Sequence, residues 1–168
     1  MKPLAAISVV VLVACQTTRG RQEGPASLAS GVKREANALE ELDRLDQRKP
    51  LPLLPMMANH QKQSMREHLA AVQELVSASA TRDFGKVAQA AQRMGYSETM
   101  AQMCEHMGAG AAGFTEQALA FHHSADKIVA AAQREDSPAV LSALSETLAL
   151  CTACHATYKQ SVVAKLAE

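Results

Sequence analysis

Apolar residues recur at helical spacing through most of the chain beyond residue 55. The first stretch predicts a helix over about 56–79 with an apolar face formed by Met65, Leu69, Val72 and Val76. The last stretch predicts a helix from about 137 to the carboxyl terminus. It carries one continuous stripe at helical spacing: Leu144, Leu148, Cys151, His155, Tyr158 and Val162.

Turn and capping residues divide the chain between these two helices. Asp83 is a plausible N-cap for a second helix that ends near Gly95, and Ser97 can restart it as far as His106. A glycine-rich loop over 108–113 precedes a third helix over about 115–134. Ser137 followed by Pro138 predicts the cap and first turn of the fourth helix.

Four helices joined by short loops predict an all-α fold, an antiparallel up-and-down four-helix bundle over residues 55–168. The composition agrees, because aromatic residues make up only 3% of the chain and alanine, leucine and methionine are common. Lysine plus arginine and aspartate plus glutamate are equal at 17 each, so nothing indicates nucleic-acid binding. No continuous apolar run approaches the roughly 20 residues of a membrane span.

The amino-terminal residues have the pattern of an export signal. A basic start and an apolar run end in Leu-Val-Ala-Cys, which resembles the lipobox of bacterial lipoproteins. The resemblance implies a signal peptide over 1–14, a lipid on Cys15 and a flexible tether over 15–54, with a short charged helix near 35–46. Gln16 after Cys15 favours the outer membrane. The alternative is an ordinary signal peptide that contains a cysteine.

Residues 151–155, Cys-Thr-Ala-Cys-His, carry the chemistry of this chain. Two thiols three positions apart can add to the two vinyl groups of one haem, and the next histidine can bind its iron. The motif therefore predicts one covalent haem c, held by Cys151 and Cys154 with His155 as axial ligand. Covalent haem of this kind is attached outside the cytoplasm, where the amino terminus also directs the chain.

Two other chemistries fit a Cys-X-X-Cys. A redox disulfide pair usually lies at a helix amino terminus, whereas this motif lies in the second half of a long predicted helix. A zinc site needs a fourth ligand and usually a second cysteine pair, which the sequence lacks. A helical lipoprotein in which the motif is accidental remains the third alternative.

The motif, its position and the helical pattern resemble the cytochrome c prime family, the class II c-type cytochromes. The likeness covers about residues 56–162 and is best from Phe114 through Phe121 to the motif, which Tyr158 and Lys159 follow as in that family. It implies electron transfer with a periplasmic redox partner, or binding of nitric oxide or carbon monoxide at a distal face. Members often pair through helix faces, so a homodimer is compatible with it. The chain is not expected to be an enzyme by itself.

The resemblance places a side chain of the first helix opposite the iron, and the alignment leaves Met65 or Lys62 there. Met65 is preferred because it shares the apolar stripe, and a thioether can bind haem iron. His60 ranks second because it points about 140° away from Met65. His68 ranks third, nearer the stripe. Plain core packing is the alternative for Met65.

The remaining cysteine and histidines are expected to be structural. Cys104 precedes His106 and Met107, and it is interpreted as a small buried hydrophobe. His122 and His123 lie in the third predicted helix, where one faces the core and one faces solvent. Phe114 and Phe121, seven residues apart, are expected to pack around the haem or the core.

Overall fold

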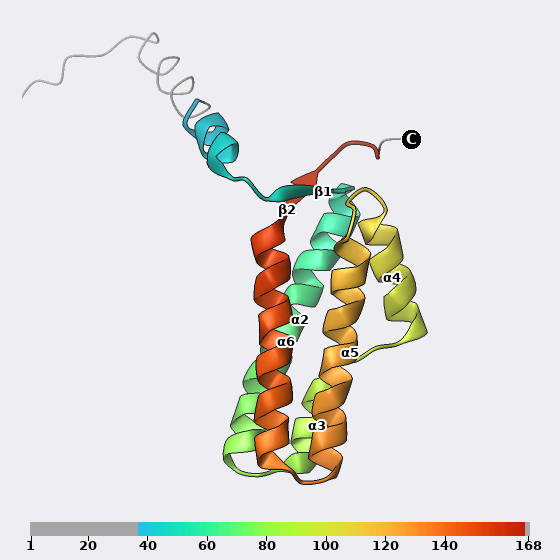
Figure 1. The fold of residues 1–168 in the computed structure, drawn as a ribbon. Coiled ribbons are helices and arrows are strands. Elements are labelled where there is room, and N and C mark those ends of the chain that lie inside the picture. Colours follow the sequence, from blue (N-terminus) through green and yellow to red (C-terminus); the bar gives the residue numbers. More distant parts are fainter. Residues whose placement is uncertain (1–36, 167–168) are drawn as a thin grey trace, which may run out of the picture. The chain divides into compact units, whose positions relative to one another are not determined.

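The computed structural model describes residues 37–166, and that part of the chain is predominantly helical (Figure 1). The residues before Gln47 form a separate unit, in which 37–45 are an exposed helix. The helix expected near 35–46 is thereby confirmed for these residues. From Gln47 onward the elements of the second unit are β1 (Lys49–Leu53), α2 (Pro55–Ala80), α3 (Phe84–Gln92), α4 (Glu98–Gly108), α5 (Phe114–Gln133), α6 (Ser137–Thr157) and β2 (Tyr158–Val162).

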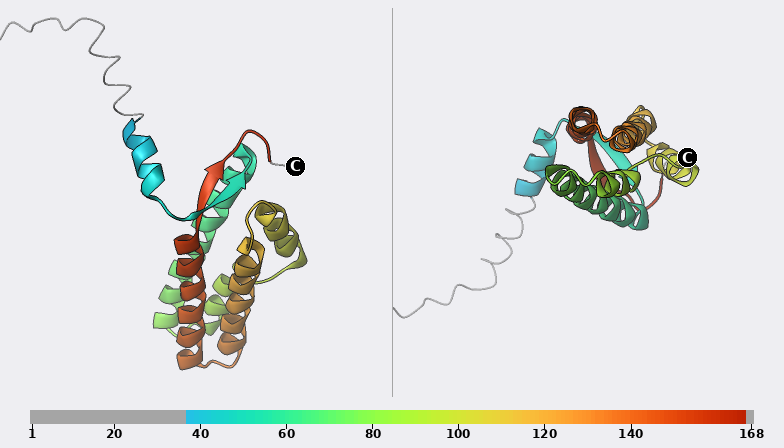
Figure 2. Two further views of the ribbon diagram at one scale, coloured as in Figure 1. Left: turned by 45° about the horizontal axis from the view of Figure 1, so that its top comes forward. Right: turned by 90° about the horizontal axis from the view of Figure 1, so that it is seen from below.

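Helix α5 is the central packing element of this unit. It lies along α6 and contacts α3 and α4, while α2 packs mainly on α3 (Figures 1 and 2). In the described residues α2 and α6 are not among the pairs of elements with extensive backbone contact. The two helices that carry the candidate chemistry therefore leave much of their facing surfaces without a helical partner.

Small residues dominate the core where the helices alone meet, which we call the helical core. Its buried side chains from α2 and α3 pack against those of α5 and α6. Because most of these side chains are small, the helix backbones approach closely. The largest fully buried side chains among them are Leu75, Met94 and Ile128. The full set is Ala71, Leu75, Ala78, Val87, Ala90, Ala91, Met94, Ala125, Ile128, Ala131, Ala132, Val140, Ala143 and Leu144.

A second cluster, which we call the strand-end core, lies where the two strands pair. Strands β1 and β2 run parallel, with Lys49 opposite Tyr158 and Leu53 opposite Val162. Their buried side chains meet residues from α2, α4 and α5. The cluster comprises Leu51, Leu53, Ala58, Met107, Ala111, Phe114 and Tyr158, with Met57, Met103, Ala118 and Cys154 packed against it.

Most predicted helix boundaries are confirmed. Asp83 caps α3 by accepting a hydrogen bond from the Lys86 backbone N–H, and Ser97 caps α4 in the same way. Gly113 has φ +83, a left-handed conformation that suits glycine, and it precedes α5. One cap was predicted wrongly, because Asp136 rather than Ser137 accepts the hydrogen bond at the start of α6.

The prediction that the last helix continues to the carboxyl terminus is wrong. Helix α6 ends at Thr157, and Tyr158 is already extended because it pairs with β1. The Tyr158 hydroxyl donates to the Ala112 carbonyl at 2.8 Å, and its ring meets Phe114 edge-on. These tertiary contacts override the helical periodicity that continues in the sequence.

The end of the segment expected to be a flexible tether also belongs to the folded unit. Leu51 and Leu53 of β1 are buried in the strand-end core, although Pro50 and Pro52 made this stretch read as linker. Gly110 lies so close to the Pro52 ring that a side chain there would collide with it. The boundary therefore falls near Gln47 rather than at residue 55.

The apolar stripe predicted on the first helix is real as a pattern but is not the buried face. Met65, Leu69 and Val76 of α2 are exposed, whereas Ala71, Leu75 and Ala78 are buried against α3. The pattern of large side chains was misleading because alanines form most of this interface.

Helix α6, Ser137–Thr157, is the one helix among residues 37–166 that is long and apolar enough to cross a membrane, judged by length and composition alone. Its only Asp, Glu, Lys or Arg residue is Glu146. Serines and threonines interrupt its apolar residues as well, so it is not a continuous apolar run. One face of the helix belongs to the helical core.

Candidate functional site

Cys151, Cys154 and His155 lie in the last turns of α6, beside the strand-end core. Both cysteines are free thiols and half-buried, and Cys154 packs against that core. They lie three positions apart on an α-helix, so their thiols share one face, and the His155 side chain beside them is exposed. The motif thus presents two neighbouring thiols and an accessible imidazole.

The electrostatics of the two thiols differ from those of a redox pair. Burial raises the pKa of Cys151, and burial together with the neighbouring Cys151 raises the pKa of Cys154. A reactive Cys-X-X-Cys has a lowered thiol pKa, commonly from a helix amino terminus. Here the pair lies at the opposite end of its helix, so both position and pKa oppose the redox alternative.

Side-chain hydrogen bonds from the two strand segments reach α6 and α2. The Arg48 Nη1 atom donates to the carbonyl oxygen of His155 at 3.3 Å. On the other strand, the Gln160 Nε2 atom donates to the Ala58 carbonyl at 3.0 Å and to Gln61 Oε1 at 2.8 Å. The pair of strands therefore connects the motif to the first turns of α2.

Several apolar side chains of α2 and α6 are exposed. Met65 is 39% exposed and Leu69 70% exposed on α2, and Leu148 is 40% exposed on α6. Farther along, Val76 and Leu141 line one groove of about 280 Å³ between the end of α2 and the start of α6. We call the five residues Met65, Leu69, Val76, Leu141 and Leu148 the apolar edge.

The distal candidates occupy different environments. Met65 belongs to neither core and stands at the apolar edge, while Lys62 and His60 are exposed. His68 is the candidate that faces inward. Its ring lies 5.0 Å from the Phe121 ring and 5.6 Å from the His122 ring, measured between centroids. The ranking of Met65 above the histidines stays a prediction.

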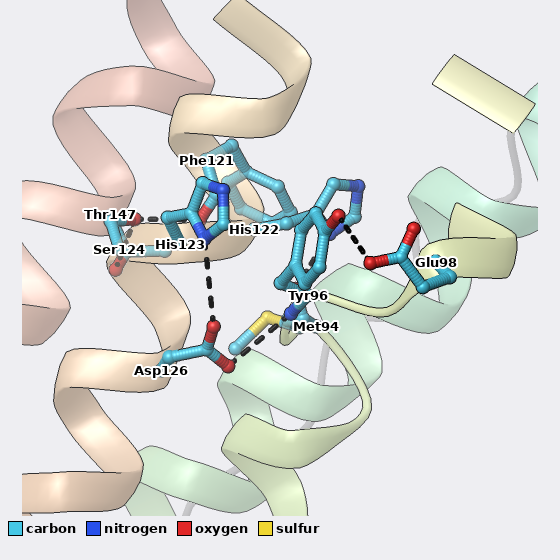
Figure 3. Close-up of polar contacts among 9 residues, drawn as sticks. All are labelled: Met94, Tyr96, Glu98, Phe121, His122, His123, Ser124, Asp126 and Thr147. Atoms are coloured by element: carbon cyan, nitrogen blue, oxygen red, sulfur yellow. Dashed lines mark hydrogen bonds and ion pairs between the residues drawn. The ribbon is translucent and has the colours of Figure 1, made fainter. Parts of the chain in front are cut away.

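His122 is the buried member of the adjacent histidine pair on α5, as expected. Its Nδ1 atom makes a 2.7 Å hydrogen bond with the Met94 carbonyl, which joins α5 to the end of α3 (Figure 3). Burial is the main cause that lowers its pKa, and burial lowers the pKa of His68 to about 4. Both rings are therefore neutral at neutral pH.

His123 faces outward and stacks on Tyr96 with 4.4 Å between ring centroids (Figure 3). Asp126 supports this stack, because its Oδ1 atom accepts the Tyr96 backbone N–H at 3.3 Å. Tyr96 also donates to Glu98, and this hydrogen bond adds to burial in raising the tyrosine pKa. The sequence analysis singled out neither Tyr96 nor Asp126, since their contact spans separate segments.

Cys104 is buried, as expected for a cysteine that packs as a small hydrophobic residue. It lies in α4, where burial raises the pKa of its thiol. His106 is exposed, and Met107 and Phe114 belong to the strand-end core. Cys15 and the signal residues 1–14 lie outside the described residues.

The donor set of the motif fits a covalently bound haem. Free thiols on one helical face supply both attachment points, and the exposed His155 supplies a nitrogen ligand. Residues 37–166 contain no group of three or more His, Cys, Asp or Glu side chains that could hold a metal ion. A zinc ion at this motif would need a further ligand from elsewhere.

Comparison with known proteins adds no relative, since no family model, curated protein or solved structure matches the chain.

Proposed function

We propose that this protein is a monohaem c-type cytochrome that transfers single electrons, with its haem attached through Cys151 and Cys154 and ligated by His155. The observation that carries the proposal is the placement of the CTACH motif. Its two protonated, half-buried thiols lie beside an exposed imidazole, near the end of a helix that also exposes Leu141 and Leu148.

The apolar edge supports a large apolar ligand between α2 and α6. Exposed leucine and methionine side chains on two neighbouring helices are unfavourable in water, by about 25 cal/mol for each Å² that could be buried. A porphyrin attached at Cys151 and Cys154 would bring a large apolar group to α6, the helix that exposes Leu148. The haem, when bound, supplies the one-electron chemistry, and the chain sets its ligands and surroundings.

The finer fold belongs to the same proposal. Helices α2, α5 and α6, with α3 and α4 as one interrupted helix, make an antiparallel four-helix bundle of the cytochrome c prime type. Short loops between consecutive helices and the central position of α5 favour this arrangement. Lys159, which follows Tyr158 in the motif's pattern, would then lie near the proximal side.

The proposed cellular setting follows from the first residues of the sequence. The chain is exported, lipid-anchored through Cys15 and held on the periplasmic side of a membrane, the outer membrane being favoured. It passes electrons to and from a periplasmic redox protein rather than acting as an enzyme. The lipobox-like ending at Cys15 supports the anchor.

The decisive test is the absorption spectrum of the exported protein after denaturation and reduction in pyridine. We expect a c-type haemochrome that survives organic extraction. Cys151→Ala and Cys154→Ala should each leave at most one thioether and change the band, whereas Cys104→Ala serves as the matched control and should leave it unchanged. A wild-type protein without any haem band would eliminate the proposal and make zinc the next assay.

One observation favours a gas-binding protein as a second candidate. Met65 belongs to neither core and is 39% exposed, so neither cluster of buried residues fixes the position of its thioether. A weakly held sixth ligand would let carbon monoxide or nitric oxide bind. If Met65→Ala leaves the carbon monoxide affinity of the reduced protein unchanged and high, with the exposed Met56→Ala of the same helix as the control, the Met65-ligated electron carrier is excluded.

A further inference from the structure

At the end of α6 the helical hydrogen bonds give way to the pairing of β2 with β1. The Tyr158 backbone N–H still reaches the Cys154 carbonyl, as in a continuing helix. The next carbonyl, that of His155, would take the N–H of Lys159, but Lys159 belongs to β2. The last carbonyls of a helix need other partners.

Arg48 provides that partner from a remote part of the chain. Its guanidinium donates to the His155 carbonyl at 3.3 Å, and the parallel register fixes its position because the next residue, Lys49, lies opposite Tyr158. An arginine that caps a helix carboxyl end also interacts favourably with the partial negative charge there. Arg48, which directly precedes β1, therefore holds the peptide group of His155, the candidate iron ligand.

We propose that Arg48 is a positioning residue for His155, so that the haem site includes the strand segment 48–53. This inference rests on the proposed haem function. Arg48 fixes the His155 peptide and thereby the direction of its imidazole toward the iron. Groups that orient a metal ligand commonly change metal affinity when they are removed. Without Arg48 the last turn of α6 frays and the bond between His155 and iron weakens.

The test compares Arg48→Gln with wild type as full-length, exported holoprotein. The ferrous protein is titrated with acid while Soret absorption reports loss of His155 from the iron, and far-UV circular dichroism reports unfolding. We expect His155 to leave the iron at a pH about one unit higher in Arg48→Gln, the effect of one charge-assisted hydrogen bond. The circular dichroism transition should move less than the Soret transition.

Four further variants separate positioning from general stability. Arg48→Met removes every donor and should repeat the shift, whereas Arg48→Lys retains a cationic donor and should restore most of it. Gln160→Leu loosens the attachment of β2 to α2 with Arg48 intact, so it should lower thermal stability without a selective Soret shift. Arg44→Gln, in the exposed helix 37–45, is the control for loss of an arginine.

The outcomes distinguish this inference from the proposed function. A wild-type protein without a covalent haemochrome contradicts the function itself. A normal haemochrome in all variants, with one common pH of His155 release, contradicts only the role of Arg48. A shift in which the Soret and circular dichroism transitions move together also overturns it, because Arg48 would then be a structural cap.

Discussion

The helical core and the strand-end core are built differently, although α2 and α5 run through both. The helical core is made by the helices, and eight of its fourteen buried residues are alanines. The strand-end core draws on two strands and a glycine-rich loop, and its only cysteine, Cys154, is half-buried.

This difference separates scaffold from site. The buried residues of the helical core are mostly alanines and include no residue of the CTACH motif, whereas the strand-end core adjoins Cys154, a free thiol next to the exposed His155. A function that depends on the CTACH motif should therefore respond to changes in the strand-end core, while global stability should respond most to the helical core.

Truncation in the helical core should have the largest effect. Leu75→Ala removes a fully buried side chain and should lower the free energy of unfolding by about 2–5 kcal/mol, measured by urea denaturation. The matched change Leu69→Ala, one and a half turns away on the exposed apolar edge, should cost less than about 0.5 kcal/mol. Equal losses at the two positions would contradict the assignment of the buried face of α2.

Acid should weaken the junction between the two cores next. The pKa of His68 is lowered by burial and by His122, and is raised less by Glu67, to about 4. Because the unfolded chain binds a proton there at higher pH, stability should be full above about pH 6.5 and decline toward pH 4. Allowing for partial exposure, we expect a loss of about 2 kcal/mol.

The comparison of His68→Leu with His60→Leu isolates this contribution. The first variant should flatten the dependence of unfolding free energy on pH between 6.5 and 4, and the second, at an exposed position of the same helix, should leave it unchanged. The lowered pKa of His122 acts in the same direction, so a residual slope should remain. If the pH dependence of the unfolding free energy is the same in His68→Leu as in wild type, His68 is not a buried, neutral ring in the folded protein.

The cap of α6 should give a smaller, local loss. Asp136→Ala removes the acceptor of the Ala139 N–H and should cost about 1 kcal/mol, whereas Ser137→Ala should cost only a few tenths. Thermal denaturation of the two variants is a direct test, because the sequence alone favours the opposite order. A larger loss in Ser137→Ala would reinstate Ser137 as the cap.

The smallest expected effect concerns the strand-end core. Tyr158→Phe deletes the hydrogen bond to the Ala112 carbonyl but keeps the ring beside Phe114, so it should cost about 0.5–1 kcal/mol. Amide exchange should increase in β1 and β2 and remain unchanged in the helical core. Faster exchange throughout the unit would show that the two cores do not open independently.

The sequence predicted the helices well because their boundaries depend on local chemistry. Asp83, Ser97 and Gly113 act through bonds or backbone angles within a few residues, and all three mark boundaries in the structure. The buried face of α2 was missed because Ala71 and Ala78 carry little hydrophobic signal compared with Leu69. Close approach of two helices selects small residues, and a search for large apolar side chains cannot detect it.

The strands and the Arg48 contact could not be predicted in this way. Pro50 and Pro52 are typical of linkers, and they are tolerated here because β1 pairs along one edge only. The Arg48 contact joins residues 107 positions apart, so no local pattern indicates it. The CTACH motif is the opposite case, because the haem prediction rests on five adjacent residues and requires no knowledge of the fold.

The parallel pairing of β1 with β2 has a consequence for the order of folding. The chain is synthesised from its amino terminus, yet the first strand of the unit cannot find its partner until the last strand has been made. Such a contact has the greatest loop-closure cost in the molecule and forms late. The helices can assemble earlier, because most of their contacts with one another involve neither strand.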